Sequence, residues 1–222
     1  MPTRKPVPAI LPWLTALAAA PFVLIVAAVT ATRFGGLDLA IGYDLLTWTV
    51  ARLLAWVGLA AALTAAVLAL RDLKGRGLYA LAALVLAGGT VAGFVLRQGQ
   101  DATPHPRDVS TNLDEPPGLP RAAGVRSGAP QTCDGVDAIP TQVLAQQATS
   151  ALVDAGFVVT RATTFQVEAV HAGAWFGFAT DAVVRIRPGR TDIRVAARGS
   201  CPDGGATCRL AAKITRNLEA GR

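Results

Sequence analysis

Long stretches of this chain lack charged residues. Residues 77–96 and 6–32 contain none, and residues 45–70 contain Arg52 alone. A helix of about 20 apolar residues covers the roughly 30 Å hydrocarbon core of a bilayer. The sequence therefore predicts three membrane spans, at about 10–32, 45–70 and 77–96. The first uncharged run is too long for the apolar region of a signal peptide, which favours an uncleaved span.

Histidine and cysteine are also scarce, with two and three residues respectively. The cysteines have neither a Cys-x-x-Cys spacing nor a histidine cluster beside them, so the sequence predicts no metal site and no cofactor. Ser110 and Ser200 lack the glycine-rich context of a nucleophile elbow. No catalytic residue is predicted, and an enzyme is the less favoured class.

The excess of positive charge lies in the first half of the chain. Residues 1–97 carry eight Lys/Arg and three Asp/Glu, whereas residues 98–222 carry thirteen and twelve. A nucleic-acid-binding protein would concentrate its basic residues on its soluble part. We therefore expect the lipid bilayer as a partner and no nucleic acid.

The short loops predict the orientation in the membrane. Five basic residues lie on one predicted side, namely Arg4, Lys5, Arg71, Lys74 and Arg76. The loop on the other side, residues 34–44, contains no Lys or Arg. Because cytoplasmic loops are enriched in these residues, we expect a cytoplasmic N-terminus and a periplasmic or extracellular C-terminal domain, as in a bacterial inner-membrane protein.

The second half reads as a linker followed by an α+β domain core. Residues 98–140 are rich in proline and glycine and predict an extended tether, although Asp108–Asn112 contains β-forming residues between turn residues. In residues 141–222, helices at 141–155 and from about 206 flank strands at 157–160, 164–171, 182–187 and 191–198. This order predicts an antiparallel sheet with the helices on one face.

Arginine alternates with apolar residues along the last two predicted strands. The arginines are Arg185, Arg187, Arg194 and Arg198, with Arg190 at the turn between the strands. Together with Asp181, this face is a candidate site for a carboxylate, a phosphate or a lipid head group. The alternative, which we favour, is a structural face in which Glu168, Asp181 and Asp192 pair with the arginines across strands.

Several short blocks resemble a known family. They are Asp108–Asn112 followed by Pro116-Pro117, Phe176–Arg187, Thr191–Ser200, Asp203-Gly204-Gly205 and Arg209-Leu210. In this order they resemble the family catalogued as domain of unknown function 1499, over roughly residues 105–219. Thr180 stands where that pattern has a second acidic residue, and Thr207 stands near an expected Asn. The resemblance implies a domain boundary and no activity.

The soluble part also contains a pair of nearby cysteines and a short aromatic segment. Cys201 and Cys208 bracket a turn, which favours a disulfide between them in an oxidising compartment and leaves Cys133 unpaired or competing. The segment Trp175–Phe178 forms an aromatic loop beside the sheet. It predicts either the mouth of an apolar pocket or, more commonly, aromatic filling of the core.

These patterns favour a membrane-anchored, non-catalytic module on the exported side that binds an envelope protein, an anionic head group or a small ligand. One alternative is an envelope hydrolase acting through Asp108, Asp181 or His171. Another is a purely structural membrane protein. Nothing in the sequence predicts the oligomeric state.

Overall fold

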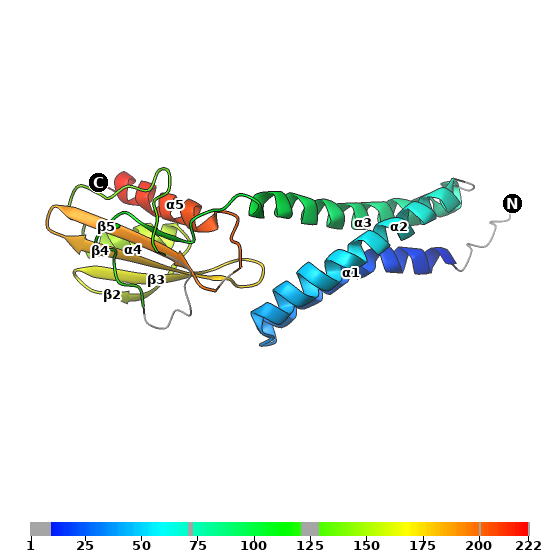
Figure 1. Ribbon diagram of the computed structural model, residues 1–222, viewed down its shortest axis with the longest axis horizontal. Coiled ribbons are helices and arrows are strands. Elements are labelled where there is room, and N and C mark those ends of the chain that lie inside the picture. Colours follow the sequence, from blue (N-terminus) through cyan, green and yellow to red (C-terminus); the bar gives the residue numbers. More distant parts are fainter. Residues whose placement is uncertain (1–9, 71–72, 121–128, 200, 222) are drawn as a thin grey trace. The chain divides into compact units, whose positions relative to one another are not determined.

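The computed structural model describes residues 10–70, 73–120, 129–199 and 201–221 (Figure 1). The chain divides into two compact units, Met1–Gln100 and Asp101–Arg222. The first unit is helical and the second is an α+β domain, which confirms the predicted fold class.

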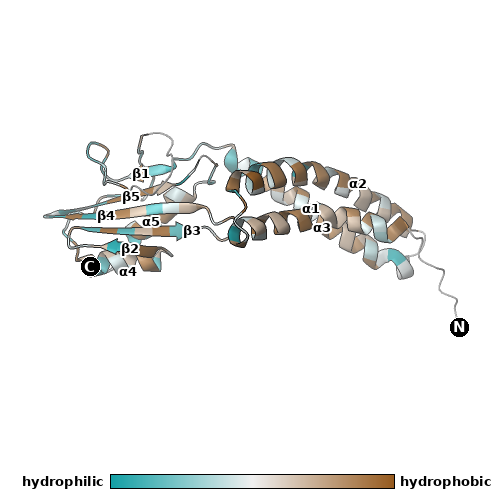
Figure 2. Ribbon diagram, turned by 90° about the horizontal axis from the view of Figure 1, so that it is seen from below, coloured by the Kyte–Doolittle hydropathy of each residue, from teal (hydrophilic) through white to brown (hydrophobic). Residues whose placement is uncertain are grey.

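The first unit contains the predicted spans. Its helices are α1 (Ile10–Phe34), η1 (Ala40–Ala51), α2 (Arg52–Ala69) and α3 (Leu73–Asp101). Three stretches are long and apolar enough to cross a membrane, at Ile10–Phe34, Ala40–Ala69 and Gly75–Asp101. Hydrophobic residues dominate these helices along their length (Figure 2). All three spans are therefore confirmed as candidate membrane helices.

The second span begins earlier than predicted because η1, a π-helix, runs directly into α2. Inside η1 the hydroxyl of Thr47 donates a hydrogen bond to the Gly42 carbonyl, and that of Thr49 donates to the Asp44 carbonyl, each five residues back. Arg4, Lys5 and Arg71, on which the predicted orientation depends, lie outside the described residues.

Small residues let α1 and α2 approach each other closely. A Cβ atom added at Gly58 would lie 3.3 Å from the Leu17 carbonyl oxygen and 3.4 Å from the Ala18 Cα. Ala18 and Ala62 also share a buried cluster with Ala83 and Ala87 of α3. Lipid tails are as apolar as the helix surfaces, so burial alone does not drive membrane helices together. Close backbone approach gives them van der Waals packing instead.

The second unit is a five-stranded antiparallel sheet with two helices on one face. The strands are β1 (Asp108–Ser110), β2 (Val158–Ala162), β3 (Gln166–Ala172), β4 (Ala179–Arg187) and β5 (Arg190–Ala197), in the spatial order β1-β5-β4-β3-β2. Helices α4 (Ala145–Asp154) and α5 (Ala206–Ala220) lie together against the sheet (Figure 1).

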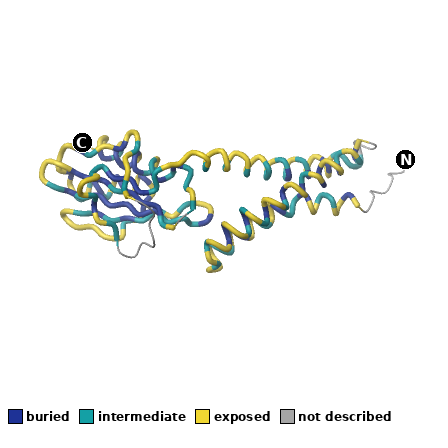
Figure 3. Tube along the Cα trace, in the orientation of Figure 1, coloured by how far each residue is buried: buried dark blue, intermediate teal, exposed yellow. Residues whose placement is uncertain are grey.

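Alternation along the strands decides which side chains form the core. Val184 and Ile186 of β4 and Ile193 and Val195 of β5 are buried in one cluster with residues of α4 and α5. Buried residues concentrate on the strands of this unit (Figure 3). Successive side chains of a strand point to opposite faces. The predicted separation of apolar residues and arginines onto opposite faces of both strands is therefore confirmed.

Two side chains depart from their predicted positions. The helix predicted from residue 141 begins only at Ala145, so Leu144, which the helical period would place with the buried Ala148, has an extended backbone and is exposed. The strand predicted from residue 164 begins only at Gln166, so Phe165, which strand alternation would place with the buried Val167, lies in the turn before β3 and is exposed.

The segment predicted as a tether belongs to the folded domain. α3 continues to Asp101, and β1 pairs with β5 along its whole length. Val109, Val136 and Ile139 are buried in the domain core. Without β1, the polar backbone groups of β5 would form an unpaired sheet edge. Pairing with β1 satisfies them, so an apparently unstructured sequence becomes an ordered fifth strand.

Candidate functional site

The sheet face opposite the helices carries a network of arginines and carboxylates. Because residues of one parity share a face, β4 and β5 place Arg185, Arg187 and Arg194 on this face. Asp181 and Asp192 lie on the same face, and β1 adds Asp108 beside β5. All three aspartates are buried, so each requires a positively charged partner.

Two of the predicted arginines are engaged in two-pronged ion pairs. Arg194 donates from Nε and Nη2 to the two carboxylate oxygens of Asp108, at 2.9 and 2.7 Å. Arg198 donates in the same way to Asp181, at 3.0 and 2.6 Å. The hydrogen bond to Asp181 raises the pKa of Arg198 above its usual value, and burial opposes this only in part. These pairs are structural, since an anion binding to either arginine would strand a buried carboxylate.

Asp192 is held by three arginines around the β4–β5 hairpin. Its carboxylate accepts hydrogen bonds from Arg185 at 3.0 Å, Arg187 at 2.6 Å and Arg190 at 2.6 Å. Burial pushes the pKa of Asp192 up, but the hydrogen bonds from Arg190, Arg185 and Arg187 outweigh it, so the pKa lies below its usual value. Asp192 is therefore a buried anion around which three guanidinium groups are organised.

Glu115, in the segment after β1, covers the outer side of this group. Its carboxylate oxygens lie 2.7 Å from Arg187 Nη1 and 3.6 Å from Arg185 Nη1, and its backbone carbonyl accepts a hydrogen bond from Arg185. The Glu115 side chain is 69% exposed, whereas that of Asp192 is fully buried. The sequence did not point to Glu115, because it lies in the segment that reads as a linker.

We call Arg185, Arg187, Arg190, Asp192 and Glu115 the hairpin arginine cluster. Its three cations and two anions leave one positive charge in excess. The buried Nε of Arg185 has no hydrogen-bond acceptor among the residues that the structure describes. An uncompensated buried N–H is costly, so the cluster has both spare charge and a spare donor. Of the five arginines singled out in the sequence, Arg185, Arg187 and Arg190 fall within it, whereas Arg194 and Arg198 pair with Asp108 and Asp181.

The residues suggested for hydrolysis are not brought together. Asp108 and Asp181 lie on one face of the sheet with Ala196 between them. His171 pairs with Thr180, the neighbour of Asp181, so it has the opposite parity. Its Nδ1 lies 2.8 Å from the carbonyl oxygen of Gly156 beside α4. The sheet thus separates the imidazole from both carboxylates.

The cysteine pairing differs from the prediction. The disulfide joins Cys133 to Cys208, with the Cα atoms 5.8 Å apart, so the predicted Cys201–Cys208 bridge is wrong. The turn between the latter two cysteines is held instead by Asp203, whose carboxylate accepts hydrogen bonds from the backbone N–H groups of Gly205 and Thr207. Such an acceptor satisfies helix N-terminal N–H groups. The local turn therefore needs no covalent bond.

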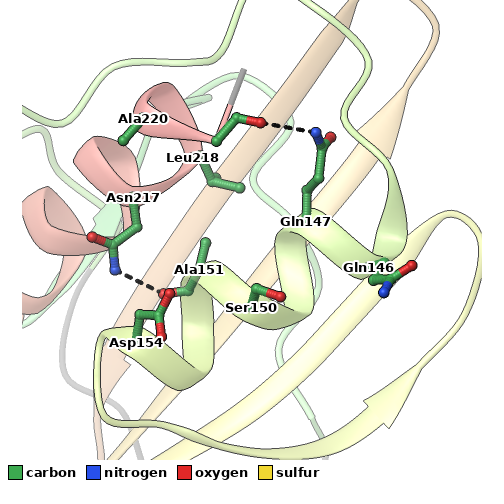
Figure 4. A pocket seen from close by; sticks show the side chains of 9 residues that line it. Gln146, Gln147, Ser150, Ala151, Asp154, Asn217, Leu218 and Ala220 are labelled. Carbon is green, nitrogen blue, oxygen red and sulfur yellow. Dashed lines mark hydrogen bonds between the residues drawn. The ribbon is translucent and has the colours of Figure 1, made fainter.

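A groove of about 490 Å³ lies between α4 and α5 (Figure 4). Two of its polar side chains are paired across it: Gln147 donates to the Gly221 carbonyl and Asn217 donates to the Ala151 carbonyl, both at 3.0 Å. These bonds join the two helices across the groove. These two side chains therefore serve the packing of α4 on α5.

No protein-family model and no curated protein sequence matches the chain. The resemblance to the domain of unknown function 1499 family stays a prediction.

Proposed function

We propose that this protein is a membrane-anchored, non-catalytic binding module whose exported α+β domain holds a carboxylate- or phosphate-bearing partner at the hairpin arginine cluster. The observation that carries the proposal is Glu115, an exposed carboxylate held between two arginines. We propose the relationship to the domain of unknown function 1499 family on the sequence blocks alone, and it implies no activity.

An anionic group of a partner can replace the Glu115 carboxylate at these arginines. Arginine forks bind carboxylate and phosphate oxygens in the same planar, two-pronged way. Asp192 stays in place, and its Oδ2 accepts a hydrogen bond from Nη2 of both Arg185 and Arg187, which holds the two guanidinium groups beside each other. A phosphate brings more negative charge than the carboxylate it displaces, and the excess positive charge of the cluster favours that exchange.

Calorimetric titration of the full-length protein in phosphatidylcholine nanodiscs with inorganic pyrophosphate or citrate tests this function. Glu115→Gln removes the competing carboxylate and should tighten binding about fivefold, whereas Arg187→Gln should weaken it about tenfold or more. Arg161→Gln is the matched control, since Arg161 on β2 is an exposed arginine that lies 3.9 Å from Glu168 on β3. Equal affinities for Arg187→Gln and Arg161→Gln would contradict the proposal.

The Cys133–Cys208 disulfide supports the exported location, because disulfides persist in oxidising compartments and are rare in the cytosol. In intact cells, labelling with a membrane-impermeant maleimide should increase after reduction. A Cys133→Ser/Cys208→Ser variant should label without that increase. Labelling that occurs only after lysis would place the domain in the cytoplasm.

A further inference from the structure

The loop between β3 and β4 presents one tryptophan on a firmly held turn. Phe176 is buried, and its ring centroid lies 6.0 Å from that of Phe178. The loop is closed at its base, where the Gly173 N–H donates to the Phe178 carbonyl at 2.9 Å. Trp175, between these anchors, is 68% exposed. Core filling thus explains Phe176 and leaves Trp175 unexplained.

The β3–β4 loop lies at the end of the sheet where the chain enters the domain. The carbonyl of Arg107, just before β1, accepts a hydrogen bond from Ala197 at 2.8 Å. The next residue, Arg198, donates its N–H to Ala179, the first residue after the loop. Neighbouring strands lie about 4.8 Å apart, so Arg107 and the loop occupy the same end of the sheet.

The connection from the third apolar stretch to this end is short. That stretch ends at Leu96, and α3 adds the helical residues 97–101, about 7 Å in length. Residues 102–107 add roughly 20 Å even when fully extended. At most about 30 Å of chain therefore separates Leu96 from Arg107. The hairpin at Arg187 lies at the opposite end of the sheet, eight residues beyond Ala179 along β4.

We propose that the β3–β4 loop is a membrane-interface anchor, with Trp175 inserted into the head-group layer of the bilayer that α1, α2 and α3 span. Tryptophan is enriched at this layer because its indole ring is apolar while its N–H can still bond to water or head groups. The loop is closed at its base and Trp175 is already exposed, so the indole can meet the head groups without unfolding the loop. This proposal does not depend on anion binding at the hairpin.

Lipid-borne quenching of a single tryptophan tests the anchor in the full-length protein. Trp13, Trp48 and Trp56 are replaced by phenylalanine, and the protein is placed in phosphatidylcholine nanodiscs that carry a spin label at the head group. Trp175 should show blue-shifted emission, lose emission to the labelled lipid and be shielded from acrylamide. In the matched control, Trp175→Phe is combined with Phe165→Trp, because Phe165 is equally exposed, at 67%, beside Ile186 near the opposite end.

The control tryptophan should emit as a water-exposed group and resist the lipid-borne quencher. If Trp175 behaves like the control, the anchor is refuted. If Trp175 is shielded from acrylamide but not quenched by labelled lipid, protein rather than lipid covers it, and the proposal is equally refuted. Preserved Cys133–Cys208 pairing in a non-reducing peptide map verifies that both variants retain the fold.

Discussion

Replacing Asp192 with asparagine should lower the free energy of unfolding of the α+β domain by about 3–5 kcal/mol. The Asp192 side chain is fully buried and accepts hydrogen bonds from Arg185, Arg187 and Arg190. Asparagine has nearly the same shape but no charge, and its amide group directs N–H donors at guanidinium donors. The substitution therefore leaves clustered cations uncompensated. Pulse proteolysis of the full-length protein across a denaturant series measures the loss.

Glu115→Gln is the matched control for this substitution. It removes a carboxylate from the same cluster, but one that is 69% exposed, so the expected loss is below about 1 kcal/mol. If the two variants lose equal stability, burial of Asp192 does not carry the effect and the interpretation of the cluster is wrong.

The stability of the domain should also fall in acid for the same reason. The pKa of Asp192 is lowered in the folded state, so below the ordinary aspartate pKa of about 3.9 the unfolded chain takes up a proton before the folded one. The contribution of Asp192 is thus present above that pH and is lost as the pH falls through the folded-state pKa. Asp192→Asn should make unfolding less dependent on pH in this window.

Loss of the Cys133–Cys208 disulfide should have a comparable effect. The bridge closes a loop with a sequence separation of 75 residues, for which chain-entropy estimates give about 4 kcal/mol. It ties the segment before Val136 to α5, and both cysteines pack against the domain core. Cys133→Ser/Cys208→Ser should therefore lower the free energy of unfolding by about 2–5 kcal/mol.

Cys201→Ser distinguishes this pairing from the one the sequence suggested. Because Cys201 lies outside the disulfide, its replacement should change stability by less than about 1 kcal/mol. A loss as large as that of the double variant, with Cys201 and Cys208 recovered in one non-reduced peptide, would reverse the assignment.

Local patterns succeeded wherever a single periodicity decided the structure. Uncharged runs predicted the three membrane helices, and alternation placed Val184 and Ile193 in the core opposite the arginines. The helix predicted to end at residue 155 is followed by Gly156, whose φ of 93° stops the helix. Each feature depends on neighbours within a few residues, so the sequence alone contains the necessary information.

Only the tertiary structure decided which distant groups meet. β1 becomes ordered because β5 offers it a sheet edge, and this pairing brings Glu115 to Arg187 and Asp108 to Arg194. The same folding brings Cys133, rather than the nearby Cys201, to Cys208. By itself, the sequence determined three apolar helices, an α+β domain and the faces of its strands, because these follow from local composition and period. The partner of each charge and each thiol depends on contacts tens of residues apart, which no local pattern contains.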